Sequence, residues 1–420
     1  MSEWEHVVVL SVDALRADHL SCYGYHRETS PALNDLAAES IRFTDAYSAS
    51  SHTREAVPAL LTGAYPDSAV DEDYRLASET VATTLSERGF ATGGFHSNPF
   101  VSRAYGFDRG FDTFDDDLHL GQHRFVALAQ RALDKLRNRH YARAAEINGR
   151  SLDWIDSLAE GQPFFLWNHY MDTHGPYEPP AEYARTYLDQ PVSDEDAQSL
   201  YQRAIADPDS ITDEEREQLI DLYDAEIRYN DAGIGAFLDA LRERDLLERS
   251  LLVVTADHGD AFGEHGYYEH PRYLHEELTH VPLLVRPPGG ASEVVSTPVS
   301  TLDVVATIED ELGVEIPSER VLLLDPPAGE RAVFQQARGE DDESQVRRYA
   351  VQSGAGSCFC ERDRRSDAVE FGGATDRSLR GVLDSHVERR VRVENGEPSE
   401  ASGTADGEIE RRLSALGYKE

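Results

Sequence analysis

The sequence contains almost no lysine. Lys135 and Lys419 are the only lysines among its 40 basic residues, so nearly all of its positive charge is carried by arginine. Positive charge is itself scarce, because 79 acidic residues leave the 420-residue chain with a net charge of −39 at pH 7. This charge excludes a general nucleic-acid binder, since a phosphate backbone would be repelled over most of the surface. The acids are spread along the whole chain, which favours adaptation to high salt over an acidic tail that binds a basic partner.

Cysteine and long apolar segments are scarce as well. Cys22, Cys358 and Cys360 are odd in number and lack the spacing of a disulfide scaffold or a zinc ribbon. No stretch approaches the roughly 18 apolar residues that a membrane span needs, and the N-terminal segment has no basic region ahead of its short apolar run. We therefore predict a cytoplasmic protein without an integral membrane segment, of unknown oligomeric state.

The residues that remain predict an α/β protein. A hydrophobic content of 40% and an aromatic content of 9% are enough for a substantial core. Short apolar runs alternate with helical patterns, which is typical of a mostly parallel sheet covered by helices. The expected central strands are residues 7–12, 91–95, 164–168 and 251–255, and the clearest helices are residues 30–39 and 213–247.

Beyond about residue 335 the composition shifts to glycine, serine, arginine and acids. This shift predicts a main domain at residues 1–335 and a small C-terminal subdomain at residues 336–420. Within the subdomain we expect a strand at residues 348–352, loose segments around residues 394–407 and a final helix near residues 408–416.

Polar residues follow the predicted central strands. Asp13 follows the first, and adjacent Asp257 and His258 follow the last, with Gly259 allowing a sharp turn. Ligands bind beyond the carboxyl ends of strands in such sheets, so these side chains are expected to converge there. A hard oxygen ligand beside an imidazole suits Mn²⁺, Zn²⁺ or Mg²⁺. Each aspartate could instead cap a turn or a helix.

Seven segments follow one another along the chain, and they begin HVVVLSVDALRADHL, VPALLTGAYP, FLWNHYMDTHGPYEPP, LYDAEIRYNDAG, VVTADHGDAFGEHG, HVPLLVRPPG and STLDVVATIEDELGV. In these segments, and in their order, the chain resembles the sulfatase family, within the alkaline phosphatase superfamily, over nearly the whole length of the main domain. The resemblance implies a large mixed, mostly parallel sheet sandwiched by helices, with residues 1–335 as the catalytic domain.

The resemblance implies a site built on one divalent metal ion, which could be Mn, Ca, Mg or Zn. The position of the family's nucleophile is occupied by Thr53, and His174 matches the histidine that contacts the transferred group or the leaving oxygen. His270 lies near the position of an active-site lysine or histidine. The implied metal ligands are Asp13, Thr53, Asp257 and His258.

Arg54 follows the proposed nucleophile directly. Its guanidinium could bind substrate oxygens in the fork geometry that suits phosphate or sulfate. It could equally pair with Glu55 or with a surface acid, and the sequence leaves these alternatives open. Four other histidines near the site are interpreted as ordinary polar or packing residues: His52, His265, His275 and His280.

Two positions depart from the family pattern. True sulfatases make a formylglycine nucleophile from cysteine or serine, and threonine cannot become that aldehyde. Ala14 stands where many sulfatases have a second aspartate ligand. Relatives with a threonine nucleophile act on phosphate esters. A hydroxyl bound to a dication loses its proton easily and could attack phosphorus to give a phosphothreonine.

These observations predict a metal-dependent hydrolase of sulfate or phosphate esters that acts through Thr53, with phosphate esters favoured on mechanism. The expected substrate is a small-molecule, glycan or lipid ester. The alternatives are a phospho-group transferase of the phosphoglycerol or phosphoethanolamine type, and a catalytically silent binding protein. Ser50 or Ser51 could supply the hydroxyl instead, although their spacing to residues 60–63 argues against it.

Overall fold

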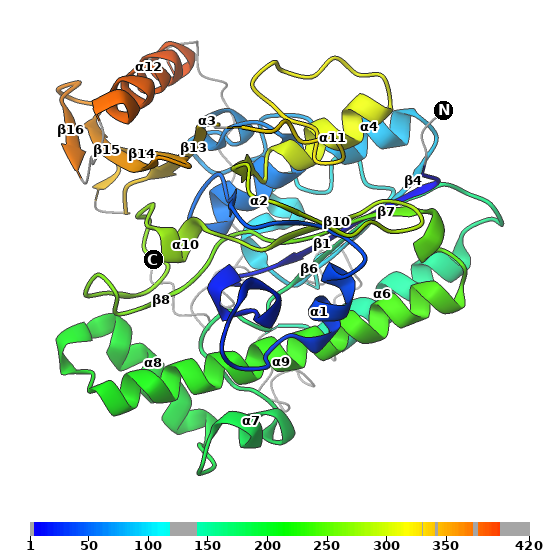
Figure 1. The fold of residues 1–420 in the computed structure, drawn as a ribbon, viewed down its shortest axis with the longest axis horizontal. Coiled ribbons are helices and arrows are strands. Elements are labelled where there is room, and N and C mark those ends of the chain that lie inside the picture. The colour runs from blue at the N-terminus through cyan, green and yellow to red at the C-terminus, as the bar shows by residue number, and fades with distance from the viewer. Residues whose placement is uncertain (1–3, 118–140, 330, 341–342, 373–376, 395–420) are drawn as a thin grey trace.

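The protein is built around one large sheet. The structure, a computed structural model, describes residues 4–117, 141–329, 331–340, 343–372 and 377–394 (Figure 1). The sheet has eight strands in the order β11-β2-β10-β7-β1-β6-β4-β5. Their bounds are β1 (His6–Val12), β2 (Ile41–Phe43), β4 (Ala91–Phe95), β5 (Thr113–Asp115), β6 (Phe164–Tyr170), β7 (Ser250–Ala256), β10 (Leu283–Arg286) and β11 (Glu293–Val295).

The centre of this sheet is parallel. Strand β1 lies between β6 and β7 and runs parallel to both, and β4 continues the parallel set beyond β6. Strand β10 is antiparallel to both β7 and β2. Every residue of β1, β6 and β7 is buried, as expected for strands that are covered on both faces. The predicted α/β class and the four predicted central strands are confirmed.

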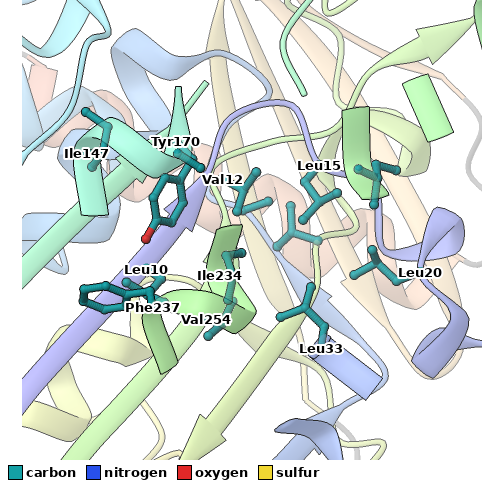
Figure 2. Close-up of a cluster of buried hydrophobic side chains, with 14 of the residues drawn as sticks. Leu10, Val12, Leu15, Leu20, Leu33, Ile147, Tyr170, Ile234, Phe237 and Val254 are labelled. Atoms are coloured by element: carbon teal, nitrogen blue, oxygen red, sulfur yellow. The ribbon is translucent and has the colours of Figure 1, made fainter. Parts of the chain in front are cut away.

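Two hydrophobic cores cover the two faces of the sheet, because successive side chains of a strand point to opposite faces. Val8, Leu10 and Val12 of β1 belong to one core, and Val7 and Val9 belong to the other. Figure 2 shows the first core, where Leu10 and Val12 lie among side chains of the helices. Its helices are α1 (Pro31–Ala37), α6 (Ala144–Ser157), α8 (Asp194–Ala206) and α9 (Asp213–Glu243), and those of the other core are α2 (Thr53–Thr62), α4 (Val81–Glu87) and α11 (Asp303–Glu311).

A second, antiparallel sheet follows the main domain in sequence. It consists of β13 (Val333–Arg338), β14 (Val346–Ser353), β15 (Gly356–Asp363) and β16 (Val369–Gly372), and α12 (Arg377–Glu394) packs on β14 and β15. The predicted strand at residues 348–352 lies within β14. The predicted domain division at residue 335 falls inside β13, and the predicted helix at residues 408–416 lies outside the described residues.

The remaining elements are short. They are β3 (Ala46–Tyr47) paired with β12 (Val299–Ser300), β8 (Ala261–Phe262) paired with β9 (Tyr268–Glu269), α3 (Pro66–Ala69), α7 (Ala181–Tyr187) and α10 (Glu276–Thr279). Among the described residues, the helices include none with the length and apolar character of a membrane span.

Candidate metal centre and active site

Three chain segments meet at the carboxyl end of the central strands. Asp13 follows β1, and Asp257 follows β7; the pairing of Val12 with Ala256 brings the two aspartates side by side. Thr53, the first residue of α2, is also buried there. Its Oγ1 lies 3.1 Å from Nε2 of His258 and 3.5 Å from Oδ2 of Asp13. The four residues expected to form the metal site are therefore together.

In each aspartate, one carboxylate oxygen accepts hydrogen bonds and the other accepts none. Oδ2 of Asp13 accepts a hydrogen bond from Nδ2 of Asn98 at 2.7 Å. Oδ1 of Asp257 accepts from the backbone N–H groups of Ala14 at 3.2 Å and His258 at 2.8 Å. Among the described residues, the buried atoms Asp13 Oδ1 and Asp257 Oδ2 have no hydrogen-bond partner. Two unpaired buried carboxylate oxygens side by side are costly unless a cation binds them.

His258 completes this arrangement. Its Nδ1 lies 2.8 Å from the carbonyl oxygen of Gly259, to which it donates, so Nε2 is the nitrogen that can bind a metal. This Nε2 lies 3.5 Å from Asp13 Oδ1 and 3.6 Å from Asp257 Oδ2. Ligands of a cation with bonds of about 2.1 Å are separated by about 3 to 3.5 Å. The donor set of two carboxylates, one imidazole and one hydroxyl fits a divalent metal ion.

Gly259 is required by close packing. A Cβ at this position would lie 2.1 Å from the carbonyl oxygen of Glu277. The Gly259 N–H donates to the carbonyl of Leu278 at 2.8 Å, so the turn after His258 is fixed against α10. The sharp turn expected at this glycine thus has a definite packing cause.

Ala14 contributes its backbone rather than a side chain. Its φ of 54° is left-handed, a conformation that costs an alanine about 1 kcal/mol. In this conformation its N–H binds Asp257, and its carbonyl accepts from the hydroxyl of Tyr223 at 2.7 Å. That hydroxyl also accepts from the N–H of Arg16 at 2.9 Å. At this position the chain thus supplies a hydrogen-bond donor to Asp257 where many sulfatases supply a carboxylate ligand.

Two residues that hold Asp13 were not singled out from the sequence, although residues 168–174 were expected near the site. They are Asn98, which follows β4, and His169 in β6, whose Nε2 lies 3.3 Å from Asp13 Oδ2. The other ring nitrogen of His169 lies 2.9 Å from Oγ of Ser11. The usable signal was the presence of polar residues inside the apolar run of β6. Asn98 had no such signal, because it lies outside the strands.

Buried charges set the pKa values of the two aspartates in opposite directions. Burial alone would raise the pKa of Asp13, but the charge of His174 and the hydrogen bond from His169 hold it well below its ordinary value. Burial and the negative charge of Asp13 raise the pKa of Asp257. Without a cation, Asp13 is therefore the aspartate that ionises more readily and Asp257 the one that ionises less readily.

His174 and His270 line the same site. The ring of His270 lies 4.5 Å from that of His258 and 5.0 Å from that of His174, centroid to centroid. Nδ1 of His174 lies 2.6 Å from the carbonyl oxygen of Gly175, to which it donates. Burial and the charge of His258 lower the pKa of His270 to about 4, so this ring is neutral at pH 7.

Aromatic rings surround Arg54, and Glu55 lies beside another arginine. Oε1 of Glu55 lies 3.5 Å from Nε of Arg338. The guanidinium of Arg54 instead lies over the rings of Phe100 and Tyr74, at 4.0 and 5.0 Å from their centroids. Such stacking fixes the position of this cation at the edge of the site.

Two further residues bear on the alternatives. The guanidinium of Arg272, which sequence reasoning missed, lies 5.6 Å from the centroid of Tyr74 and adds a second cation at this edge. Oγ of Ser50, an alternative source of the nucleophilic hydroxyl, donates to Oε2 of Glu55 at 3.4 Å.

Comparisons with known proteins identify the family of this chain. The model of the family described as Sulfatase matches residues 5–314. The chain is 25% identical over 369 residues to the uncharacterized sulfatase YidJ of Escherichia coli (strain K12), a match that covers 79% of this chain and 73% of the relative.

Solved structures share the fold. One is a protein in complex with its substrate D-glucosamine-2-N,6-O-disulfate, with a TM-score of 0.70 at 18% identity over 93% of this chain and 98% of that one. Another is the phosphonate monoester hydrolase of Agrobacterium radiobacter, with a TM-score of 0.67 at 18% identity over 92% of this chain and 95% of that one.

Proposed function

The chain belongs to the sulfatase family of hydrolases, and on that premise we propose that it is a metal-dependent hydrolase of phosphate esters with Thr53 as its nucleophile. The observation that carries the proposal is the position of the Thr53 hydroxyl. It is buried at the start of α2, 3.1 Å from Nε2 of His258, beside the two unpaired carboxylate oxygens of the aspartates. Asp13, Asp257, His258 and Thr53 would hold the divalent metal.

When bound, the metal would lower the pKa of the threonine hydroxyl and neutralise charge on the transferred group. The Thr53 hydroxyl gives its proton to water, its oxygen bonds to phosphorus, and the bond from phosphorus to the alcohol oxygen breaks. His174 supplies the proton that the departing alcohol needs. A water molecule then attacks phosphorus in the phosphothreonine and passes a proton to His174. The bond from phosphorus to the Thr53 oxygen breaks, that oxygen takes back a proton from water, and phosphate leaves.

The choice of phosphate over sulfate rests on threonine chemistry. A formylglycine can expel sulfate by elimination from a hemiacetal, whereas an esterified threonine has no such route and must wait for water to attack. Phosphothreonine is open to that attack at phosphorus. Among proteins of the same fold, one is a phosphonate monoester hydrolase and another binds a sulfated glucosamine as its substrate, so this architecture serves phosphorus esters as well as sulfated substrates.

Local positive charge must overcome the net charge of −39 to admit an anionic substrate. Arg54 and Arg272, both near the ring of Tyr74, lie at the edge of the site, and both oppose protonation of buried His52. We assign them to binding of substrate oxygens. High salt would screen the repulsion that remains.

A substrate panel tests the proposal. Nitrophenyl phosphate, bis-nitrophenyl phosphate and nitrophenyl sulfate are offered to the chelator-stripped chain after it is reloaded with Mn²⁺, Mg²⁺, Ca²⁺ or Zn²⁺. We expect phosphate-ester cleavage that depends on metal, falls at least about 10³-fold in Thr53→Ala, and is partly kept in the matched control Thr53→Ser.

The other outcomes separate the alternatives. Faster cleavage of the sulfate than of the phosphate esters would overturn the preference for phosphorus. Transfer of phosphate to added glycerol, in place of its release, would identify a transferase. Metal binding without cleavage of any ester would favour a silent binding protein, and full turnover by Thr53→Ala would exclude Thr53 as the nucleophile.

A further inference from the structure

We propose that His265, His275 and Glu277 form a second metal site, selective for Zn²⁺ or a cation of similar softness. In the described ranges, two groups of three side chains have ligand atoms within 4.8 Å of one another, and this cluster is the one outside the aspartate site. The proposal does not depend on whether Thr53 is the nucleophile.

The geometry is close to that of a tetrahedral zinc site. Nε2 of His265 lies 3.2 Å from Oε1 of Glu277, and Nδ1 of His275 lies 3.9 Å from the same oxygen. Two ligands of tetrahedral zinc with bonds of about 2.05 Å are separated by about 3.3 Å. The first pair has this separation, the second pair is wider, and all three ligand atoms lie within 4.8 Å of one another.

The ligand chemistry differs from that of the aspartate site. Two imidazoles and one carboxylate suit zinc and the later transition metals, whereas two carboxylates and a hydroxyl also suit harder cations. The side chain of Glu277 is only 7% exposed, so its charge is largely removed from water. The side chain of His265 is 46% exposed, which gives a cation a route from solvent.

Tyr267 contacts two of the three proposed ligands. Its hydroxyl lies 2.6 Å from Nδ1 of His275 and 3.1 Å from Oε1 of Glu277. This oxygen is therefore in place to serve as a fourth ligand.

The site would join two segments that position the active site. His265 lies in the turn between β8 and β9, which leads directly to His270. His275 precedes α10 and Glu277 lies within it, and the next residue of α10 accepts the hydrogen bond from Gly259. In Figure 1, α10 and β8 lie at the same end of the main sheet. A bound cation would therefore link the β8–β9 hairpin to α10, next to the segments that carry His258 and His270.

Zinc binding by single-residue variants tests the proposal. The full chain is stripped with a chelator and titrated with Zn²⁺ alone, and the bound metal is counted by mass spectrometry. We expect two zinc ions per wild-type chain and one per chain of Glu277→Gln or His265→Ala. The matched controls Glu276→Gln, which changes the exposed neighbouring carboxylate, and His26→Ala should keep two.

A variant without the aspartate site isolates the second one. Asp257→Asn should keep one zinc ion, and zinc should raise its unfolding midpoint; adding His275→Ala should abolish both effects. Co²⁺ should give tetrahedral visible absorption in the wild type that is lost in Glu277→Gln and kept in Glu276→Gln.

The proposal is overturned if Glu277→Gln and His265→Ala bind zinc with the stoichiometry and affinity of the wild type. In that case the residues form a hydrogen-bonded cluster only. If Asp257→Asn does not fold, the comparison of Glu277→Gln with Glu276→Gln in the otherwise wild-type chain gives the same decision.

Discussion

Replacing Asn98 by alanine should weaken metal binding through Asp13, although Asn98 touches no metal itself. Its Nδ2 donates to Asp13 Oδ2 at 2.7 Å, a shorter contact than the 3.3 Å from His169. A hydrogen bond to a charged group contributes about 1.5 to 3 kcal/mol. Loss of a residue that orients a metal ligand typically costs about 10- to 100-fold in affinity, or about 1.4 to 2.8 kcal/mol. We therefore expect the metal dissociation constant to rise by that factor.

Calorimetric titration of the chelator-stripped protein measures this constant. The matched control is Asn148→Ala, which removes another buried asparagine whose Nδ2 donates to the carbonyl of Gly233 at 2.9 Å. Both variants should lose stability, but only Asn98→Ala should lose metal affinity, and saturating metal should restore its kcat. Unchanged affinity in Asn98→Ala, or an equal loss in Asn148→Ala, would refute the role given to Asn98.

Three further predictions concern stability and packing. Removing the divalent metal should lower the unfolding midpoint in calorimetry, because metal at 100 times its dissociation constant contributes about 2.7 kcal/mol; an unchanged midpoint would count against the site. Burial lowers the pKa of His96 to about 3, so between pH 7 and pH 5 the unfolded chain gains a proton that the native chain does not. In denaturant unfolding, the free energy of unfolding of the wild type should therefore fall by about 2 kcal/mol more than that of His96→Phe between pH 7 and pH 5. Equal losses in the two proteins would refute this role of His96. Gly259→Ala should sharply reduce metal binding in a titration, because its Cβ would lie 2.1 Å from the Glu277 carbonyl oxygen. The control Gly149→Ala, whose Cβ would lie in open space, should bind metal normally, and its free energy of unfolding should rise by about 0.5 to 1 kcal/mol.

Much of the main sheet could be predicted from the sequence because parallel strands are buried on both faces. The runs at residues 7–12, 91–95, 164–168 and 251–255 lie within β1, β4, β6 and β7. The outer strands β2 and β11 are only three residues long, too short for a periodic pattern. In the C-terminal sheet, β15 buries Cys358 and Cys360 between exposed residues, and this alternation is hidden by the charged and glycine-rich composition around it.

The candidate site was predictable where neighbouring residues carry a pattern or where the family resemblance supplies a position, as it did for Asp13, Thr53 and His174. Asp257 and His258 are adjacent and follow a buried strand, so they were visible from the sequence. The contact between Asn98 and Asp13 joins residues 85 positions apart, and no local pattern marks it. The partner of Glu55 is likewise Arg338, from the other sheet. Adaptation to high salt and a cytoplasmic location stay predictions.

Trapping the covalent intermediate tests the central claim most directly. The wild-type chain, loaded with metal, is quenched with acid during turnover of a phosphate ester, digested, and analysed by mass spectrometry. The account predicts one phosphoryl group on Thr53, in the peptide that carries the start of α2, and none in Thr53→Ala. A phosphoryl group on another residue, or turnover in Thr53→Ala at the wild-type rate, would contradict it.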